Sequence, residues 1–198
     1  MTRGRTKLLR NPEMVQLGGE LATHLDTWIE SSTPPSLAGL LDEVSLDLLR
    51  DAFIDVGGCE GTVWLADRTR ENLVAVYNSG SDAVELVGFQ QPVGTGIISL
   101  VFTQQQPYCE NDIGASPGHD DTLDKKIAKR TQAMIAVPFY FAYGLRGVIS
   151  CVQLEDSPNG SSGYSSDDVQ TLVRASNIVE RLINDSLLSS ALGLSDGG

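Results

Sequence analysis

The spacing of hydrophobic residues follows a helical period through the first part of the chain. Met14, Leu17, Leu21, His24 and Trp28 recur at intervals of three and four residues, which predicts a helix over 12–30. A seam this narrow is typical of helix-on-helix packing. His24 in the seam has two interpretations, a pH-responsive contact at a dimer interface or a half-exposed polar spacer, and the second is favoured.

A second apolar stripe predicts another helix over 37–56. The stripe runs from Leu37 to Val56 at helical spacing, after a break at residues 31–35 that contains two prolines. Ser36 is the predicted N-cap, and Gly57 with Gly58 ends the helix.

Beyond residue 58 the pattern changes to that of strands joined by short helices. Residues 62–66 and 73–77 predict a hairpin around the polar turn 67–72, and residues 84–89 predict a weaker strand or an ordered loop. Short helices are predicted over 96–104 and 122–130, with a short strand at 107–110 and a polar loop over 111–122. Two strands, 133–141 and 145–154, are apolar on both faces, which places them at the covered centre of a sheet.

The last predicted helix spans 166–190, with Ser165 and Asp168 placed to form a capping box. Adjacent hairpins within a mixed order of elements predict an α+β domain with an antiparallel sheet. Residues 1–35 are predicted to form a basic arm and a dimerisation helix, 36–190 the domain itself, and 191–198 a disordered tail.

Composition narrows the possible partners. The 198 residues include 14 Lys and Arg against 26 Asp and Glu, for a formal net charge of -12, which repels nucleic acid and anionic membranes. Four of the basic residues precede the first acidic one, Glu13, so the arm is either a solvated tail or a contact for an anionic partner. The sequence shows neither a membrane-length apolar run nor a signal-peptide pattern, so a cytoplasmic location is expected.

The few cysteines and histidines give little support for a disulfide framework, a metal site or a nucleophilic catalyst. Cys59, Cys109 and Cys151 are odd in number and far apart, which argues against a disulfide framework or structural zinc and fits a reducing compartment. Two histidines cannot build a His-rich metal site, so neither a metal nor a cofactor is expected. Cys109 with His119 is conceivable as a nucleophile and base, but a buried structural cysteine is favoured.

Two other features have both a binding and a structural interpretation. Gly94-Thr95-Gly96 precedes a predicted helix and would cradle a phosphate or simply form a tight turn, and the turn is favoured. Lys125, Lys126, Lys129 and Arg130 would hold an anionic ligand or form a solvated helix face, and the solvated face is favoured.

Residues from about 37 to 185 resemble a GAF domain in the order of their motifs. After the hairpin come Gly94-Thr95-Gly96, the segment Pro107-Tyr108-Cys109-Glu110-Asn111-Asp112, and a strand with a central proline, Pro138. Gly147-Val148-Ile149 and then Tyr164-Ser165-Ser166-Asp167-Asp168 complete the set. The resemblance implies a central antiparallel sheet with the terminal helices on one face and short helices covering a pocket on the other.

The resemblance also places a ligand between the central strands and residues 96–131. The residues expected to line that pocket are Trp64, Phe102, Tyr108, Cys109, Asp112, Leu123, Ile127, Thr131, Met134 and Ala136. A mainly apolar lining favours a small, weakly charged or aromatic ligand over a nucleotide.

Subtype signatures favour regulation over catalysis. Asn159, Tyr164 and Asp168 match part of the cyclic-nucleotide signature, but Gly160 and Val169 replace its Lys and Glu. The cysteine set of the free methionine sulfoxide reductases is not matched, nor is the Cys-His pair of bilin-binding domains.

We therefore expect a non-enzymatic GAF regulator that binds a small molecule, forms a homodimer through its helices and acts on a separate effector protein. A ligand-free module for dimerisation or protein docking is the alternative, and a thiol-dependent reductase is less favoured.

Overall fold

The computed structural model describes residues 11–115, 129–155 and 163–191, and the chain divides after Ser31 into two compact units. The first unit contains helix α1 (Pro12–Ser31), at the position that the apolar seam predicts. Asn11 begins this helix, because its side-chain oxygen accepts from the amide of Glu13 at 3.0 Å. Val15 and Leu17 are exposed on α1, and so is His24.

The second unit is built on a six-stranded antiparallel sheet of order β3-β2-β1-β6-β5-β4. Its strands are β1 (Glu60–Ala66), β2 (Asn72–Asn78), β3 (Gln90–Pro92), β4 (Tyr108–Glu110), β5 (Thr131–Phe141) and β6 (Gly144–Leu154). The long apolar strands β5 and β6 lie inside the sheet, as predicted. Ala142 and Tyr143 join them with φ of 46° and 57°, the paired positive angles of a tight hairpin turn.

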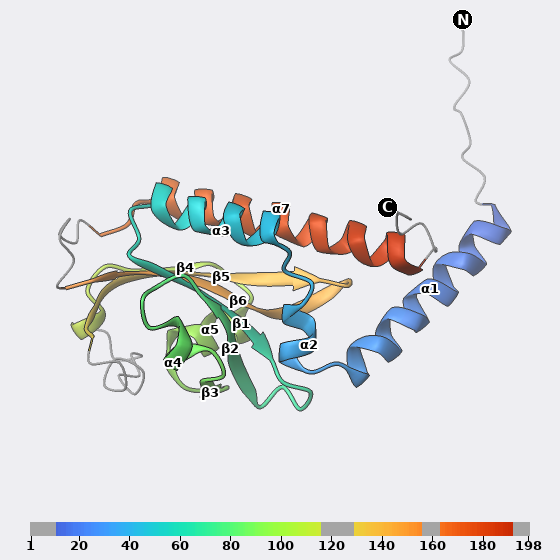
Figure 1. Ribbon diagram of the computed structural model, residues 1–198, viewed down its shortest axis with the longest axis horizontal. Helices are drawn as coiled ribbons and strands as arrows, with labels where there is room; N and C mark the ends of the chain where they lie inside the picture. The colour runs from blue at the N-terminus through green and yellow to red at the C-terminus, as the bar shows by residue number, and fades with distance from the viewer. Residues whose placement is uncertain (1–10, 116–128, 156–162, 192–198) are drawn as a thin grey trace, which may run out of the picture. The chain divides into compact units, whose positions relative to one another are not determined.

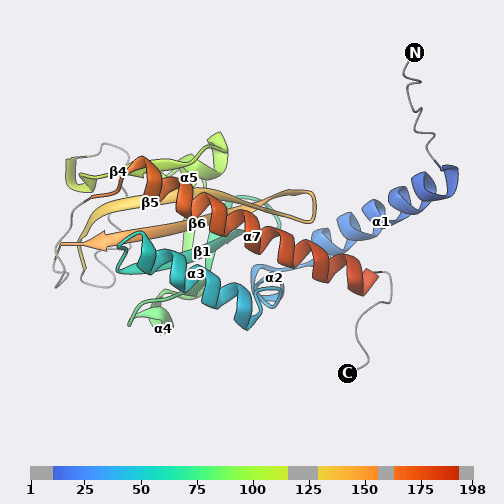
Figure 2. The same cartoon turned by 90° about the horizontal axis from the view of Figure 1, so that it is seen from above.

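Two helices cover one face of the sheet. Helix α3 (Glu43–Asp55) and helix α7 (Ser166–Ala191) lie side by side there (Figures 1 and 2). Leu49 of α3 and Leu172 of α7 are fully buried, and Val63 and Val137 are buried in the strands. This arrangement and the antiparallel sheet confirm the predicted α+β class.

The single helix predicted over 37–56 is wrong, because two separate caps divide this segment. Thr33 caps a short helix α2 (Pro34–Ala38), in which Ser36 is the third residue and not the cap. Asp42 then caps α3 by accepting from the amide of Ser45 at 2.8 Å.

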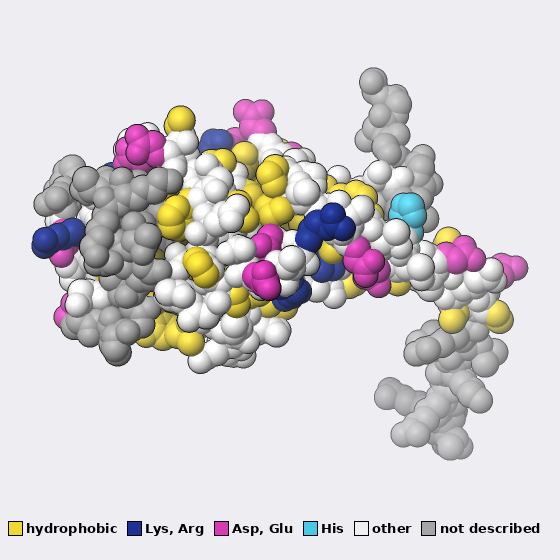
Figure 3. Space-filling model, turned by 90° about the horizontal axis from the view of Figure 1, so that it is seen from below, with side chains coloured by type: hydrophobic (Ala, Val, Ile, Leu, Met, Phe, Trp, Pro, Cys, Tyr) yellow, Lys and Arg dark blue, Asp and Glu magenta, His cyan; other side chains and the backbone are white. Residues whose placement is uncertain are grey.

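Short elements cover part of the opposite face: α4 (Ala83–Leu86), α5 (Gly96–Gln104) and the 3-10 turn η1 (Ile113–Ala115) (Figure 1). Figure 3 shows the molecule from this side, with hydrophobic side chains at the surface among polar ones. Helix α5 has the predicted bounds. The segment 84–89 is predicted as a weaker strand or an ordered loop, but its first residues belong to the helical turn α4, in which Leu86 is buried while Val84 is 94% exposed. The helix predicted over 122–130 lies mostly outside the described residues.

Helix α7 confirms the predicted capping box. The Asp168 carboxylate accepts from the amide of Ser165 at 2.7 Å, and the Ser165 hydroxyl accepts from the amide of Asp168 at 3.3 Å. The helix therefore begins where the sequence indicates, and its 26 residues carry it along the sheet.

Candidate functional site

A hydrophobic cluster joins the sheet to α5 on the face away from α3 and α7. Trp64, Phe102 and Ala136 are at most 4% exposed within it, and Tyr108 and Met134 pack against it while partly exposed. Tyr108 of β4 lies opposite Ala136 of β5 in the strand register. The structure thus brings five of the predicted lining residues to one face.

Buried polar groups interrupt this apolar face. The indole Nε1 of Trp64 donates to the hydroxyl of Ser150 at 3.0 Å, and the side-chain Nδ2 of Asn78 donates to the hydroxyl of Thr62 at 2.9 Å. Both hydroxyls lie on neighbouring strands, because Thr62 pairs with Ser150 in the register of β1 and β6. The centre of the sheet therefore carries two hydroxyl groups beside Trp64.

An ion-pair cluster lies at the beginning of β1. The ammonium of Lys129 pairs with the carboxylates of Glu60 and Asp82, and it lies 3.4 Å from the hydroxyl of Ser81. Only 7% of the Glu60 side chain is exposed, whereas the Lys129 and Asp82 side chains are 23% and 32% exposed. The cluster ties the segment that enters β5 to the sheet and to the loop before α4.

The ammonium and carboxylate groups of this cluster stabilise one another in their charged forms. Burial lowers the pKa of Lys129, but hydrogen bonds to the Asp82 and Glu60 carboxylates outweigh it, and the pKa lies above its usual value. The hydrogen bond from Lys129 is the main cause that lowers the pKa of Asp82. Lys129 is therefore fully charged at neutral pH.

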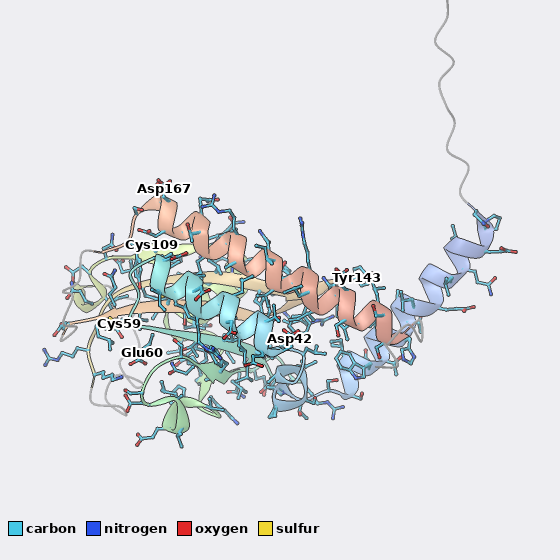
Figure 4. All side chains as sticks on the ribbon, turned by 45° about the horizontal axis from the view of Figure 1, so that its top comes forward. Asp42, Cys59, Glu60, Cys109, Tyr143 and Asp167 are labelled. Carbon is cyan, nitrogen blue, oxygen red and sulfur yellow. The ribbon has the colours of Figure 1, made fainter. Side chains whose placement is uncertain are left out.

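Cys109 lies on the other side of β4, away from the hydrophobic cluster. Its Sγ is 4.0 Å from the backbone oxygen of Tyr164, just before α7, and Figure 4 shows Cys109 at the end of the sheet where this helix begins with Asp167 in its first turn. Burial is the main cause that raises the pKa of the Cys109 thiol, and the negative charges of Glu110 and Asp168 raise it further. A thiol in this setting is a poor nucleophile.

Cys151 is also unsuited to nucleophilic chemistry. It is fully buried, accepts from the hydroxyl of Tyr164 at 3.6 Å, and its pKa is raised to about 12, mainly by burial. Cys59 is exposed at the beginning of β1, next to Glu60 (Figure 4).

Two other predicted lining residues, Asp112 and Thr131, do not join the cluster. Asp112 is exposed, and its amide donates to the Glu110 carboxylate at 3.2 Å. Thr131 is buried at the beginning of β5, opposite Leu154. Leu123 and Ile127 lie outside the described residues, as does His119.

The glycines before α5 form a tight turn. Gly94 and Gly96 have φ of 105° and 76°, a region that favours glycine. The amide of Gly94 donates to the hydroxyl of Ser99, and the side chain of Gln91 donates to the backbone oxygen of Thr95 at 3.1 Å. These internal partners favour the structural interpretation of the Gly-Thr-Gly segment over a phosphate cradle.

Several polar residues of the domain have partners that the sequence does not predict. Glu60 begins the mainly apolar strand β1 and Ser150 stands inside β6, and a buried polar residue in such a strand signals a specific partner. The sequence around Asn111 and Glu180 does not indicate their hydrogen bonds, because their partners are backbone groups 53 and 40 residues away.

In the described part of the chain, no group of three or more His, Cys, Asp or Glu side chains is arranged to hold a metal ion. A search of the described helices likewise finds none with the length and hydrophobicity that a membrane span requires.

Comparison with family models gives no match, and comparison with curated proteins gives none either. Solved structures do match. The GAF domain of an Acinetobacter phosphoenolpyruvate-protein phosphotransferase has a TM-score of 0.57 and 16% identity, covering 93% of this chain and 99% of that one. The GAF-B domain of DevS from Mycobacterium smegmatis has a TM-score of 0.53 and 18% identity, covering 75% and 94%.

A reductase has a similar structure. Free methionine-R-sulfoxide reductase from Neisseria meningitidis, solved in complex with its substrate, has a TM-score of 0.54 and 15% identity, covering 92% of this chain and 99% of that one. Identities this low establish a shared fold and not a shared activity. The antiparallel sheet with α3 and α7 on one face and α4 and α5 on the other therefore has the fold of a GAF domain.

Proposed function

We propose that this chain is a non-enzymatic GAF sensor that binds a small molecule on the α5 side of its sheet. The supporting observation is the mixed character of that face, where the hydroxyl of Ser150 accepts from the indole of Trp64 and Thr62 lies opposite Ser150 in the strand register. An apolar surface with a few fixed polar groups is typical of small-ligand sites. Half-buried Tyr108 and Met134 would contact the ligand at the edge of the hydrophobic cluster.

The proposed ligand is small and carries little net charge. Lys129 is neutralised by two carboxylates, so it offers no free cation to a phosphate. An aromatic or neutral polar molecule would stack against the apolar side chains and bond to the hydroxyls. Neither a metal nor a cofactor is part of the proposal.

Native mass spectrometry of the protein purified from its own host tests this function. The expected result is a mass above that of the polypeptide, which returns to the polypeptide mass after unfolding and refolding in clean buffer. The released molecule should raise the melting temperature of the refolded protein, as mass action requires. A polypeptide mass alone, with equal melting temperatures before and after refolding, would reject the proposal.

The second candidate function is a ligand-free module for dimerisation or docking. It is favoured by the close packing around Ala136, which is fully buried between β4, β6 and α5. In that case the same side chains fill the interior of the domain. A thiol-dependent reductase is not proposed, because Cys109 lies on the opposite side of the sheet from the hydrophobic cluster.

We further propose that the sensor is a homodimer that acts on a separate effector protein through its helices. Ile178 is 46% exposed on α7, and Val44 and Ile54 are 62% and 71% exposed on α3. Exposed apolar residues on a layer of two helices offer surface for an interface.

Light scattering at micromolar concentration should report twice 21.2 kDa. Ile178→Glu should shift the protein towards monomer, whereas the control Val84→Glu, on the opposite side of the sheet, should not. A monomeric parent chain would exclude the dimer.

A further inference from the structure

Tyr140 of β5 makes one hydrogen bond towards α5 and another towards α7. Its hydroxyl bonds to the side-chain oxygen of Gln105 at 3.2 Å, at the residue that ends α5. Its backbone amide donates to the Glu180 carboxylate of α7 at 2.9 Å. One residue thus contacts the helices of both faces of the sheet.

The contact with α7 is part of a two-point attachment. Glu180 and Asn184 are one helical turn apart, and they accept from the amides of Tyr140 and Ala142 at 2.9 and 2.8 Å. The register of β4 covers only residues 134–136 of β5, so both amides lie beyond the end of that pairing. The hydroxyl of Ser176 lies 3.3 Å from the same Glu180 oxygen.

This attachment fixes the position of α7 along the sheet. A slide of the helix by half a turn, about 2.7 Å, would carry Glu180 and Asn184 past their amides and leave both donors unpaired. Helix α7 therefore has a discrete position on the hairpin of β5 and β6.

The contact with α5 is made at a special backbone conformation. Gln105 has φ of 57°, in the left-handed region, and its amide donates to the backbone oxygen of Val101 at 2.9 Å to close the helix. Helix α5 contributes Ile98, Val101 and Phe102 to the hydrophobic cluster. The Tyr140 hydroxyl thus holds the end of the helix that covers the proposed ligand face.

We infer that Tyr140 couples the position of α5 to that of α7. The biological use of this coupling rests on the proposed function, because a ligand beneath α5 would displace the helix and its terminal residue Gln105. Loss of the hydroxyl contact gives the β5 backbone at Tyr140 more freedom to move. The hydrogen bond from the Tyr140 backbone amide to the Glu180 carboxylate weakens as a result. A change in the position of α5 thereby alters the position of α7, the helix that carries the exposed Ile178.

Hydrogen exchange of Tyr140→Phe, in the full chain without added ligand, tests the coupling. This variant removes only the hydroxyl, so we expect exchange to rise about 3–10-fold at the end of α5, the equivalent of one ordinary hydrogen bond. Residues 176–184 of α7 should also exchange at least about twofold faster. The matched control Tyr143→Phe removes a hydroxyl from a 74% exposed side chain on the same hairpin and should change neither region.

A second variant excludes a general loss of stability. Gln105→Ala removes the acceptor and should produce the same pattern in α7, whereas Gln104→Ala, at the exposed neighbouring position, should leave α7 unchanged. Faster exchange confined to α5 in both Tyr140→Phe and Gln105→Ala would overturn the coupling. That result would leave the ligand proposal intact, because native mass spectrometry tests ligand binding separately.

Discussion

The side chain of Asn111 pairs with both backbone polar groups of Tyr164. Its Nδ2 donates to the Tyr164 oxygen at 3.0 Å, and its Oδ1 accepts from the Tyr164 amide at 2.7 Å. Gly163 lies close beside it, because a Cβ at this position would come within 2.9 Å of the Asn111 side chain. The segment after β4 is thereby fixed to the chain that leads into α7.

Asn111→Ala should destabilise the domain by about 1–2 kcal/mol, because it leaves the Tyr164 amide and carbonyl without this partner. Asn111→Asp tests the geometry, since a carboxylate accepts from the amide but cannot donate to the carbonyl. We expect Asn111→Asp to recover part of the loss in urea denaturation. Equal stability of the parent chain and Asn111→Ala would contradict the assigned role.

Glu180 should make stability fall as pH rises through the weakly acidic range. Burial is the main cause that raises the pKa of this carboxyl above its usual value of 4.5, against the hydrogen bonds from the Tyr140 amide and Ser176. The folded chain therefore binds the proton more tightly than the unfolded chain. Between the unfolded and folded pKa values, the ionised carboxylate becomes an increasing cost to folding.

Glu180→Gln keeps an acceptor for the Tyr140 amide and removes this ionisation. The stability of the parent chain relative to Glu180→Gln should thus decrease as pH rises from about 4.5, where the unfolded group titrates, to neutral. Urea denaturation of both chains at several pH values measures the difference and cancels the titration of shared groups. Parallel curves would show that Glu180 titrates alike in both states.

The elements that the sequence predicts well are those whose signals are local. The capping pair Ser165 and Asp168 lies three residues apart at the beginning of a long apolar period, and so α7 is predicted within one residue. The strands β5 and β6 are long, apolar and joined by a two-residue turn. Residues 83–86 form a helical turn too short to establish a period, which is why the pattern over 84–89 predicts a strand or loop instead.

The candidate site was harder to predict because its polar contacts join residues far apart in sequence. Lys129 and Glu60 are 69 residues apart, and Trp64 and Ser150 are 86 apart. The side of β4 that Cys109 takes depends on the register with β5, since one residue of slip would exchange Cys109 with Tyr108. Composition and spacing could therefore identify the lining strands but not the face that each residue occupies.

Lys129→Met should cost more stability than Glu60→Gln. Without Lys129, the buried Glu60 carboxylate has no cation, and we expect a loss of about 3 kcal/mol, the lower end for buried pairs. Glu60→Gln leaves Lys129 paired with Asp82 and should cost about 1 kcal/mol.

The double variant Lys129→Met with Glu60→Gln should therefore be more stable than Lys129→Met alone. Chemical denaturation of the three variants and the parent chain measures this coupling. Additive losses would mean that the pair does not interact in solution.

Cys109→Ser should leave function intact and cost about 1 kcal/mol of stability through lost packing. Cys151→Ser should cost more, because Cys151 is fully buried against the Tyr164 hydroxyl. Neither the parent chain nor the variants should support the consumption of NADPH by a thioredoxin and thioredoxin reductase coupling system when free methionine-R-sulfoxide is supplied. Activity that Cys109→Ser abolishes would establish the reductase function instead.

Replacement of Ala136 by Phe should separate a filled core from an open site. Ala136 has no exposed surface and faces the α5 side between Tyr108 and Ser150. A larger side chain there should overpack the cluster and cost about 1–3 kcal/mol, a fall of roughly 2–12 °C in melting temperature for a chain of this size. Met134→Ala, at a half-buried position on the same strand face, should cost about 1 kcal/mol or less in the ligand-free protein because its side chain still meets solvent.

The two variants together locate the room available for a ligand. A large loss for Ala136→Phe with a small one for Met134→Ala confines a ligand to the Met134 end of the face. A nearly neutral Ala136→Phe means that open space extends to Ala136, because only a void accepts the ring without strain. Large losses in both variants would mean that the whole face is packed interior, and the ligand-free docking module would then account better for the fold.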